Sequence, residues 1–176
     1  MVFIGLIKDE SVMKPDNSPI ETKALKLCTV GEFLAVLASD AMLPGAGAAG
    51  GIALALAAAC AGKAVAITRR HDVRSALLAN LQMQLTRIAE QALVLAQTDA
   101  IQFKQQLVSG DPAASDALLH TGHTILEACR TLDRILCDNE HHIADNMAGD
   151  WKAARALSDA CLCIHQENVR ELKSET

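Results

Sequence analysis

The stretch LPGAGAAGGIALALAAACAGKAVAITRR, residues 43–70, places a proline and several glycines before the most alanine-rich segment of the chain. Proline ends a helix and glycine permits a sharp change of direction, so these residues predict a break between two helices. Alanine has the highest helix propensity, and the segment up to Arg70 is therefore predicted to be helical. Because glycines and Lys63 interrupt its apolar run, we expect a buried central helix rather than a membrane span.

The same stretch contains GAGAAG, residues 45–50, which matches the dinucleotide-binding pattern G-x-G-x-x-G. In that motif a strand leads into the glycine turn, and an acidic residue about 20 positions later binds the ribose. Here the preceding segment has a helical period, and Arg69 and Arg70 stand where the acid belongs, so a nucleotide site is excluded. Two roles for the glycines stay open. They can expose helix amides to an anion or carbonyl oxygen, or allow a neighbouring helix to approach closely.

The composition of the 176-residue chain indicates a single domain built from helices. Hydrophobic residues make up 51% of it, largely alanine and leucine, whereas aromatic residues make up 2% and tyrosine is absent. Strands favour aromatic and β-branched residues, so helices packed on small side chains are favoured. The six cysteines are expected to be reduced and mostly buried, because no export signal is recognisable.

The charge pattern argues against two classes of partner. The formal net charge is −5, and the scattered basic residues do not alternate with aromatic ones, so the footprint of a nucleic-acid-binding protein is absent. The opening apolar run is too short for a signal sequence, and no basic residue precedes it. We therefore expect a cytoplasmic protein whose partners include neither nucleic acid nor membrane.

Local signals divide the chain into an arm and a helical domain. Residues 1–27 contain two prolines and no sustained period, and are expected to form a loosely attached arm before a domain over residues 28–176. The domain opens with TVGE, residues 29–32, the pattern of a capping box at the start of a first helix. After that helix and the alanine-rich one, hydrophobic periodicity predicts three more.

The three later helices each carry a start signal or an apolar stripe. One long amphipathic helix follows Asp72 and either continues or restarts near Thr98. The next begins with Asp111 as N-cap and Pro112 as its first residue. A polar connector with room for one short helical turn follows, after which Asp150 is the predicted N-cap of the last helix.

Two polar residues fall in line with apolar stripes. The spacing from Leu95 to Leu107 includes Asp99, and the predicted inward row of the last helix includes Asn168. A buried polar group costs free energy unless it has a partner, so both positions call for an explanation. Asp99 can be a cap if the helix restarts at Thr98, and Asn168 can bond across a helix interface.

Three stretches, taken in order, carry a family resemblance. The first is FLAVLASDAMLPGAGAAGGIALALAAACAGKAVAITRR, residues 33–70, where a proline–glycine motif separates two helices. The second is LVLAQTDAIQF, residues 93–103, and the third is GDWKAARALSDACLCIHQENV, residues 149–169. Over residues 29–169 their order and spacing resemble those of the formimidoyltetrahydrofolate cyclodeaminase and methenyltetrahydrofolate cyclohydrolase family.

The resemblance implies an all-α fold, a single-domain antiparallel helical bundle of five to seven helices, some of them long. It also implies a homodimer that binds a reduced folate at or near the subunit interface. The substrate would be a tetrahydrofolate derivative, with no bound cofactor. The reaction would be cyclohydrolysis or cyclodeamination of the one-carbon unit between N5 and N10, which makes the enzyme a hydrolase or an ammonia lyase.

The resemblance also suggests catalytic and binding residues. A buried carboxylate can stabilise the cationic one-carbon bridge and carry a proton, and Asp99 is the first candidate, followed by Asp150 and Asp40. Asp150 can instead be only an N-cap, and Asp40 only a solvated residue at a helix end. The expected substrate-binding residues are Pro44, Gly45, Gly47, Phe103, Asn168, Arg69 and Arg70. The two arginines would meet the folate carboxylates, or else be solvated cations at a helix end.

The loop departs from the family at two positions. The family motif PGGGS is here Pro44-Gly45-Ala46-Gly47-Ala48, so that one glycine and the serine hydroxyl are missing. The alternative function is therefore a catalytically impaired relative that acts as a folate-binding or helical assembly subunit.

Some histidine and cysteine residues have the helical spacing of possible metal ligands. His120 with His123, and Cys161 with His165, lie one turn apart on a helix, but no paired ligands occur at zinc-finger spacing. We therefore expect no metal.

Overall fold

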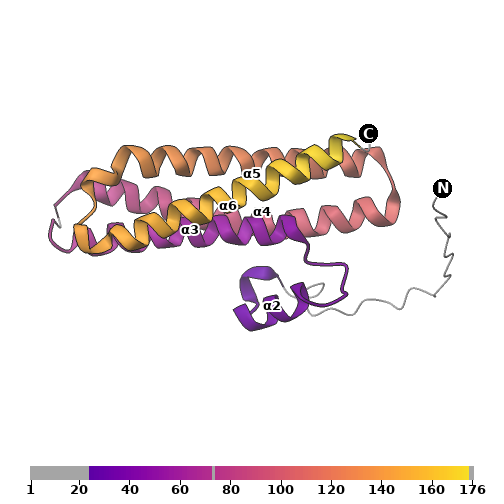
Figure 1. Ribbon diagram of the computed structural model, residues 1–176, viewed down its shortest axis with the longest axis horizontal. Helices are drawn as coiled ribbons and strands as arrows, with labels where there is room; N and C mark the ends of the chain where they lie inside the picture. Colours follow the sequence, from indigo (N-terminus) through magenta and orange to yellow (C-terminus); the bar gives the residue numbers. More distant parts are fainter. Residues whose placement is uncertain (1–23, 73, 175–176) are drawn as a thin grey trace, which may run out of the picture.

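The computed structural model describes residues 24–72 and 74–174, which form an α-helical bundle (Figure 1). No strand occurs in this part of the chain, and the predicted all-α bundle is confirmed. The predictions for residues 1–23 lie outside the described residues. The helices are α2 (Val30–Leu37), α3 (Ala46–Arg69), α4 (Ala76–Ser109), α5 (Pro112–Asn139) and α6 (Ala148–Ser174), with single 3-10 turns η1 (Leu25–Leu27), η2 (Glu140–His142) and η3 (Asp145–Met147).

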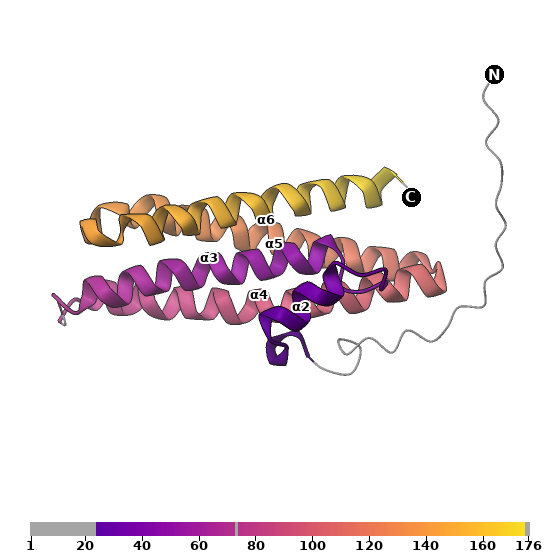
Figure 2. The ribbon, with the colours of Figure 1, turned by 60° about the horizontal axis from the view of Figure 1, so that its bottom comes forward.

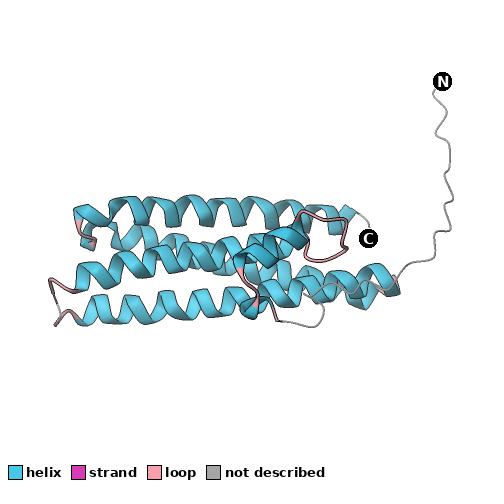
Figure 3. Cartoon of the chain, turned by 90° about the horizontal axis from the view of Figure 1, so that it is seen from below, coloured by secondary structure: helices cyan, strands magenta, loops and turns pink. Residues whose placement is uncertain are grey.

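The four long helices run antiparallel to their neighbours in the sequence, because short connections join them (Figures 1 and 2). Each long helix packs extensively against two others, and α3 lies diagonally opposite α5. The short helix α2 lies beside the bundle near the start of α3 (Figure 3). Ahead of it, Leu25 is buried against α4, and its backbone amide donates to the side-chain oxygen of Gln97 at 2.6 Å.

The alanine-rich helix α3 is the central element of the core. It is long and apolar enough to cross a membrane by length and composition, yet 56% of its most apolar window is buried inside the bundle. Small side chains allow α4 and α6 to approach its backbone closely. Leucines and isoleucines of the other helices complete this core, together with Trp151, whose indole nitrogen donates to the Leu136 carbonyl at 3.1 Å.

The predicted starts of α2 and α5 are confirmed. The Thr29 hydroxyl accepts the Glu32 amide at 3.1 Å, and the Glu32 carboxylate accepts the Thr29 amide, which completes the capping box. Asp111 caps α5 by accepting the Ala113 amide at 3.0 Å. Just before it, Gly110 ends α4 with a φ of 60°, a left-handed conformation that favours glycine.

The suggested restart near Thr98 is wrong, because α4 is continuous from Ala76 to Ser109. The Thr98 hydroxyl donates to the Val94 carbonyl one turn earlier, a bond that a threonine inside a helix can make without interrupting it. No glycine or proline lies within this helix. Asp99 is therefore not a cap, and its position on the apolar stripe needs another explanation.

Two predictions for the last helix need correction. The helix begins at Ala148, after two 3-10 turns rather than one, so Asp150 lies in its first turn and is not the N-cap. Asp150 there forms an ion pair with Lys63 of α3 at 2.9 Å. The buried row is also shifted. The sequence predicts an inward row of Ala154, Leu157, Cys161, Ile164, Asn168 and Leu172. The observed buried row is Trp151, Ala154, Ser158, Cys161, His165 and Val169, which shares only Ala154 and Cys161 with it.

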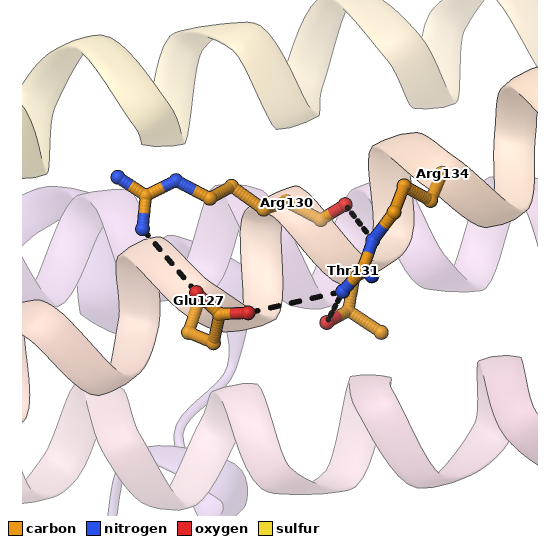
Figure 4. A network of polar contacts seen from close by, with 4 residues as sticks. All are labelled: Glu127, Arg130, Thr131 and Arg134. Carbon is orange, nitrogen blue, oxygen red and sulfur yellow. Dashed lines mark hydrogen bonds and ion pairs between the residues drawn. The ribbon is translucent and has the colours of Figure 1, made fainter.

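The outward face of α5 is polar and makes contacts within its own helix. Figure 4 shows Glu127 bonded to Arg130 and Arg134, while Arg134 also donates to Thr131. These charged side chains are exposed, and such pairs contribute only about 0.3 to 0.5 kcal/mol each to helix stability. This network explains the solvated face of α5 and does not form a site.

The contact between α3 and α4 predicts which glycine the fold requires. A Cβ atom added to Gly51 would lie 2.7 Å from the Ala96 Cβ and 3.0 Å from its Cα, so the backbones would have to separate. We expect Gly51→Ala to lower the free energy of unfolding by about 1 to 3 kcal/mol in urea denaturation. Gly149→Ala is the control, because nothing lies within 4 Å of its added Cβ, and it should be neutral or slightly stabilising. Equal stability of the two variants would contradict this packing.

Candidate functional site

Helix α3 begins directly after the glycine loop, and its N-terminus has no side-chain cap. Pro44 is buried before the turn, and Gly45 is the N-cap residue, with an extended backbone and no hydrogen bond from a side chain. The first intrahelical bond runs from the Ala49 amide to the Gly45 carbonyl. The amides that precede it have no acceptor within the helix, so this end of α3 is polar and electropositive.

Asp99 of α4 lies against this first turn. A Cβ added to Gly47 would be 2.2 Å from one carboxylate oxygen of Asp99 and 2.5 Å from the other. No other residue type would leave this space, and Asp99 is only 7% exposed. The close-approach role predicted for the loop glycines is thereby realised at Gly47, with a carboxylate as the approaching group.

His165 of α6 approaches the next part of the same helix. A Cβ added to Gly50 would lie 2.9 Å from the His165 Nε2 atom. The imidazole is fully buried, and neither ring nitrogen makes a hydrogen bond of ordinary geometry within the described residues. A buried polar group without a partner is uncommon in a folded protein, so His165 is a second anomaly beside Asp99.

A cavity of about 380 Å³ opens beside these two residues, within the size range of small-molecule sites. Its walls come from the start of α3, the second halves of α4 and α6, and the first half of α5. Asp99 and His165 are accompanied mainly by apolar side chains. The cavity is lined by Gly45, Ala46, Asp99, Phe103, Gln106, Leu107, Leu118, Gly122, His165, Asn168, Val169, Glu171 and Leu172.

Burial sets the protonation of the two titratable residues. It raises the pKa of Asp99 from 3.8 to about 6, and no described cation offsets this effect. Burial lowers the pKa of His165 from 6.5 to about 4, although the nearby Gly47 carbonyl acts in the opposite direction. At neutral pH the cavity therefore contains an ionised carboxylate and a neutral imidazole. This combination suits a cationic ligand and proton transfer.

Several of the predicted site residues come together here. Gly45, Asp99, Phe103 and Asn168 line the cavity, and Gly47 lies directly beneath Asp99. They come from the starts or ends of α3, α4 and α6, with 52 positions between Gly47 and Asp99 and 65 between Phe103 and Asn168, so the fold is what assembles them.

The other predicted residues lie elsewhere. Asp40 is exposed in the loop after α2 and does not line the cavity. Asp150 lies 15 residues before His165 on α6, which corresponds to roughly 22 Å of helix. Arg69 and Arg70 end α3, and Arg69 is 22 residues beyond Gly47, or roughly 33 Å. Within a single chain, Asp150, Arg69 and Arg70 are therefore too distant to contact a ligand beside Asp99.

His165 is a cavity residue that is not among the site residues predicted from the sequence. Its spacing suggests it only as a partner of Cys161 in a metal site, and among residues 24–72 and 74–174 no three acidic, histidine or cysteine side chains gather to hold a metal. The available signal was its spacing, since His165 follows Cys161 by four residues and therefore shares its buried face.

Asp99 should reduce stability at neutral pH. Its pKa is higher in the folded chain, about 6, than the ordinary 3.8, so its contribution to stability is complete below pH 3.8 and is lost as the pH rises through 6. Asp99→Asn should raise the free energy of unfolding at pH 7.5 by about 1 to 3 kcal/mol and change it little near pH 4. Urea denaturation at both pH values measures this difference.

His165 provides the opposite control. Its pKa is lowered by folding, so its contribution is present above pH 6.5 and is lost as the pH falls through 4. His165→Gln should therefore gain stability relative to the unsubstituted chain as the pH falls from 6.5 to 4. If the free energy of unfolding of both variants changed with pH just as that of the unsubstituted chain does, these two groups would not be buried as described.

Comparisons with known proteins agree with the geometry. Residues 29–109 match the family model described as Formiminotransferase-cyclodeaminase. No curated protein matches the chain in sequence. Among solved structures, the chain is similar to the 2.80 Å crystal structure of formiminotetrahydrofolate cyclodeaminase from Thermotoga maritima. The TM-score is 0.77 at 18% identity, with 85% of this chain and 80% of that chain covered. The resemblance to the formiminotransferase-cyclodeaminase family is therefore confirmed, in sequence over residues 29–109 and in fold over most of the chain.

Proposed function

We propose that the chain is an enzyme that acts on the one-carbon bridge between N5 and N10 of a tetrahydrofolate derivative. The observation that carries this proposal is Asp99, a carboxylate buried in the cavity wall, with no cationic partner among the described residues and ionised at neutral pH. The family match covers both the glycine loop and Asp99. The methenyl bridge and the protonated formimino group are both amidinium-like cations, which would supply the missing positive charge.

The reaction follows from this charge complementarity. Cyclohydrolysis has water attack the cationic methenyl carbon, and cyclodeamination has N10 attack the formimino carbon with loss of ammonia. Both pass through a tetrahedral carbon beside a delocalised cation. A fixed carboxylate in a cavity with few water contacts stabilises that charge more strongly than it would in bulk water.

The missing serine of the loop does not argue against activity. Ala48 is fully buried in a small apolar cluster with Leu43, Ala96 and Ala100, and it does not line the cavity. A hydroxyl at this position would therefore point into the core. Ala46 does line the cavity, where its methyl group adds apolar surface beside the first turn of α3.

Turnover of methenyltetrahydrofolate tests the proposal directly. We expect the protein to accelerate the loss of its ultraviolet absorbance above the buffer rate, and Asp99→Asn to lower kcat by about 10²-fold or more. Asp159→Asn is the control, since Asp159 is exposed on α6 and does not line the cavity. The same assay with the formimino substrate and ammonia detection separates the two reactions.

The outcomes separate the enzyme from its alternative. Binding of the folate without turnover would assign the chain as a folate-binding subunit. Absence of both binding and turnover would reject the proposal.

We further propose that the chain forms a homodimer. Helix α2 has no buried residue and leaves Val30 and Leu34 exposed, while α3 leaves Leu56 half-exposed. Exposed apolar side chains on neighbouring elements are typical of an interface.

Sedimentation velocity at micromolar concentration should give twice the mass of the chain. Leu56→Asp, on α3, should shift the distribution toward the monomer. Met83→Asp, at an exposed position on α4, should not. A monomer for the unsubstituted chain at 100 μM would reject the dimer.

A further inference from the structure

Two glycines of α3 make room for two titratable side chains. Gly47 leaves the space occupied by the Asp99 carboxylate, and Gly50 leaves the space occupied by the His165 imidazole. The two side chains come from different helices, α4 and α6, and both form part of the wall of one cavity.

This arrangement is costly for a fold. Glycine stabilises a helix less than alanine does, and each buried polar side chain loses its contacts with water. Asp99 has no described ion pair, and neither nitrogen of His165 makes a hydrogen bond of ordinary geometry within the described chain. Such unrecovered costs occur at functional positions more than elsewhere.

From this geometry we propose that His165 is the proton-transfer residue of the site and acts beside Asp99. The inference rests on the proposed function and adds a second catalytic residue to it. The two residues divide the chemistry, because an ionised carboxylate stabilises the cation while a neutral imidazole accepts a proton.

The steps balance as follows for cyclohydrolysis. The water oxygen forms a bond to the bridging carbon, one water proton passes to an imidazole nitrogen of His165, and the C=N electron pair moves to nitrogen, which leaves a neutral tetrahedral adduct. The imidazolium then protonates the departing nitrogen as the carbon–nitrogen bond breaks. The hydroxyl proton of the adduct passes to the imidazole and then to solvent, and a formyl group remains.

The imidazole must turn to reach the substrate. In the structure its nitrogens are covered, with Nε2 beside Gly50. The proposal therefore requires rotation about the side-chain bonds of His165, which lines the cavity, to turn a ring nitrogen toward the substrate. Asp99 from α4 and Glu171 from α6 are the acidic groups on the cavity wall, and the described residues that α3 and α5 contribute to it carry no charge.

The test is steady-state kinetics with methenyltetrahydrofolate. We expect His165→Ala to lower kcat by about 10²-fold or more with less than a threefold change in KM. Added imidazole should restore part of the rate in His165→Ala and none in Asp99→Asn. Gly50→Ala, whose Cβ displaces the ring, should lower kcat in the same direction. His141→Gln is the control, because His141 is exposed in η2 at the other end of the bundle.

The outcomes distinguish this inference from the proposed function. An active protein in which folded His165→Ala or His165→Gln keeps kcat within threefold would overturn the role of His165 alone. A loss that imidazole does not rescue in a folded His165→Ala variant would also overturn it. Failure of the unsubstituted protein to turn over or bind the folate would instead reject the proposed function.

Discussion

The approach of α4 to the first turn of α3 is the contact on which the rest of the structure depends. Gly47 and Gly51 lie one turn apart on the same face of α3, and α4 places Asp99 on one and Ala96 on the other. The spacing of four residues on α3 against three on α4 keeps the two helices in register along this contact. Without it, Asp99 would not be buried and the cavity would lose one of its walls.

The cavity lies where α3 begins and α6 approaches its end. The polar start of a helix, an ionised carboxylate and a neutral imidazole are thereby surrounded by apolar side chains of α4, α5 and α6. The low dielectric of these walls strengthens the field of Asp99 and keeps His165 uncharged. The same burial that costs stability prepares both groups for chemistry at neutral pH.

Local sequence signals predicted the helices well, whereas contacts between residues distant in the sequence were harder to predict. The capping box at Thr29 and the Asp111–Pro112 start depend on neighbouring residues alone, so the sequence was sufficient for them. Asp99 was found because a carboxylate interrupted an apolar period. Asp150 was predicted as an N-cap because aspartate is favoured both at the N-cap and in the first turn of a helix. Its ion-pair partner Lys63 is distant in the sequence, so the residues around Asp150 do not indicate this contact.

The register of α6 failed for a related reason. Apolar residues such as Leu157 and Ile164 flank the buried row, so the hydrophobic pattern alone allowed two neighbouring rows, and contact with α3 selected the one that contains His165. The positions of Arg69 and Arg70 depend on the direction and length of α3. A motif read along the sequence does not show that 33 Å of helix, roughly, separates them from the glycine loop.

The glycines of α3 also determine how this cavity can diverge. Every substitution at Gly47, Gly50 or Gly51 adds atoms where none fit, so random mutagenesis should recover few functional replacements there. The opposite walls are made of ordinary apolar side chains, including Phe103 and Leu118, which volume-conserving exchanges can reshape at small cost. New ligand preferences in this scaffold are therefore expected to arise on α4 and α5, while the α3 wall stays fixed.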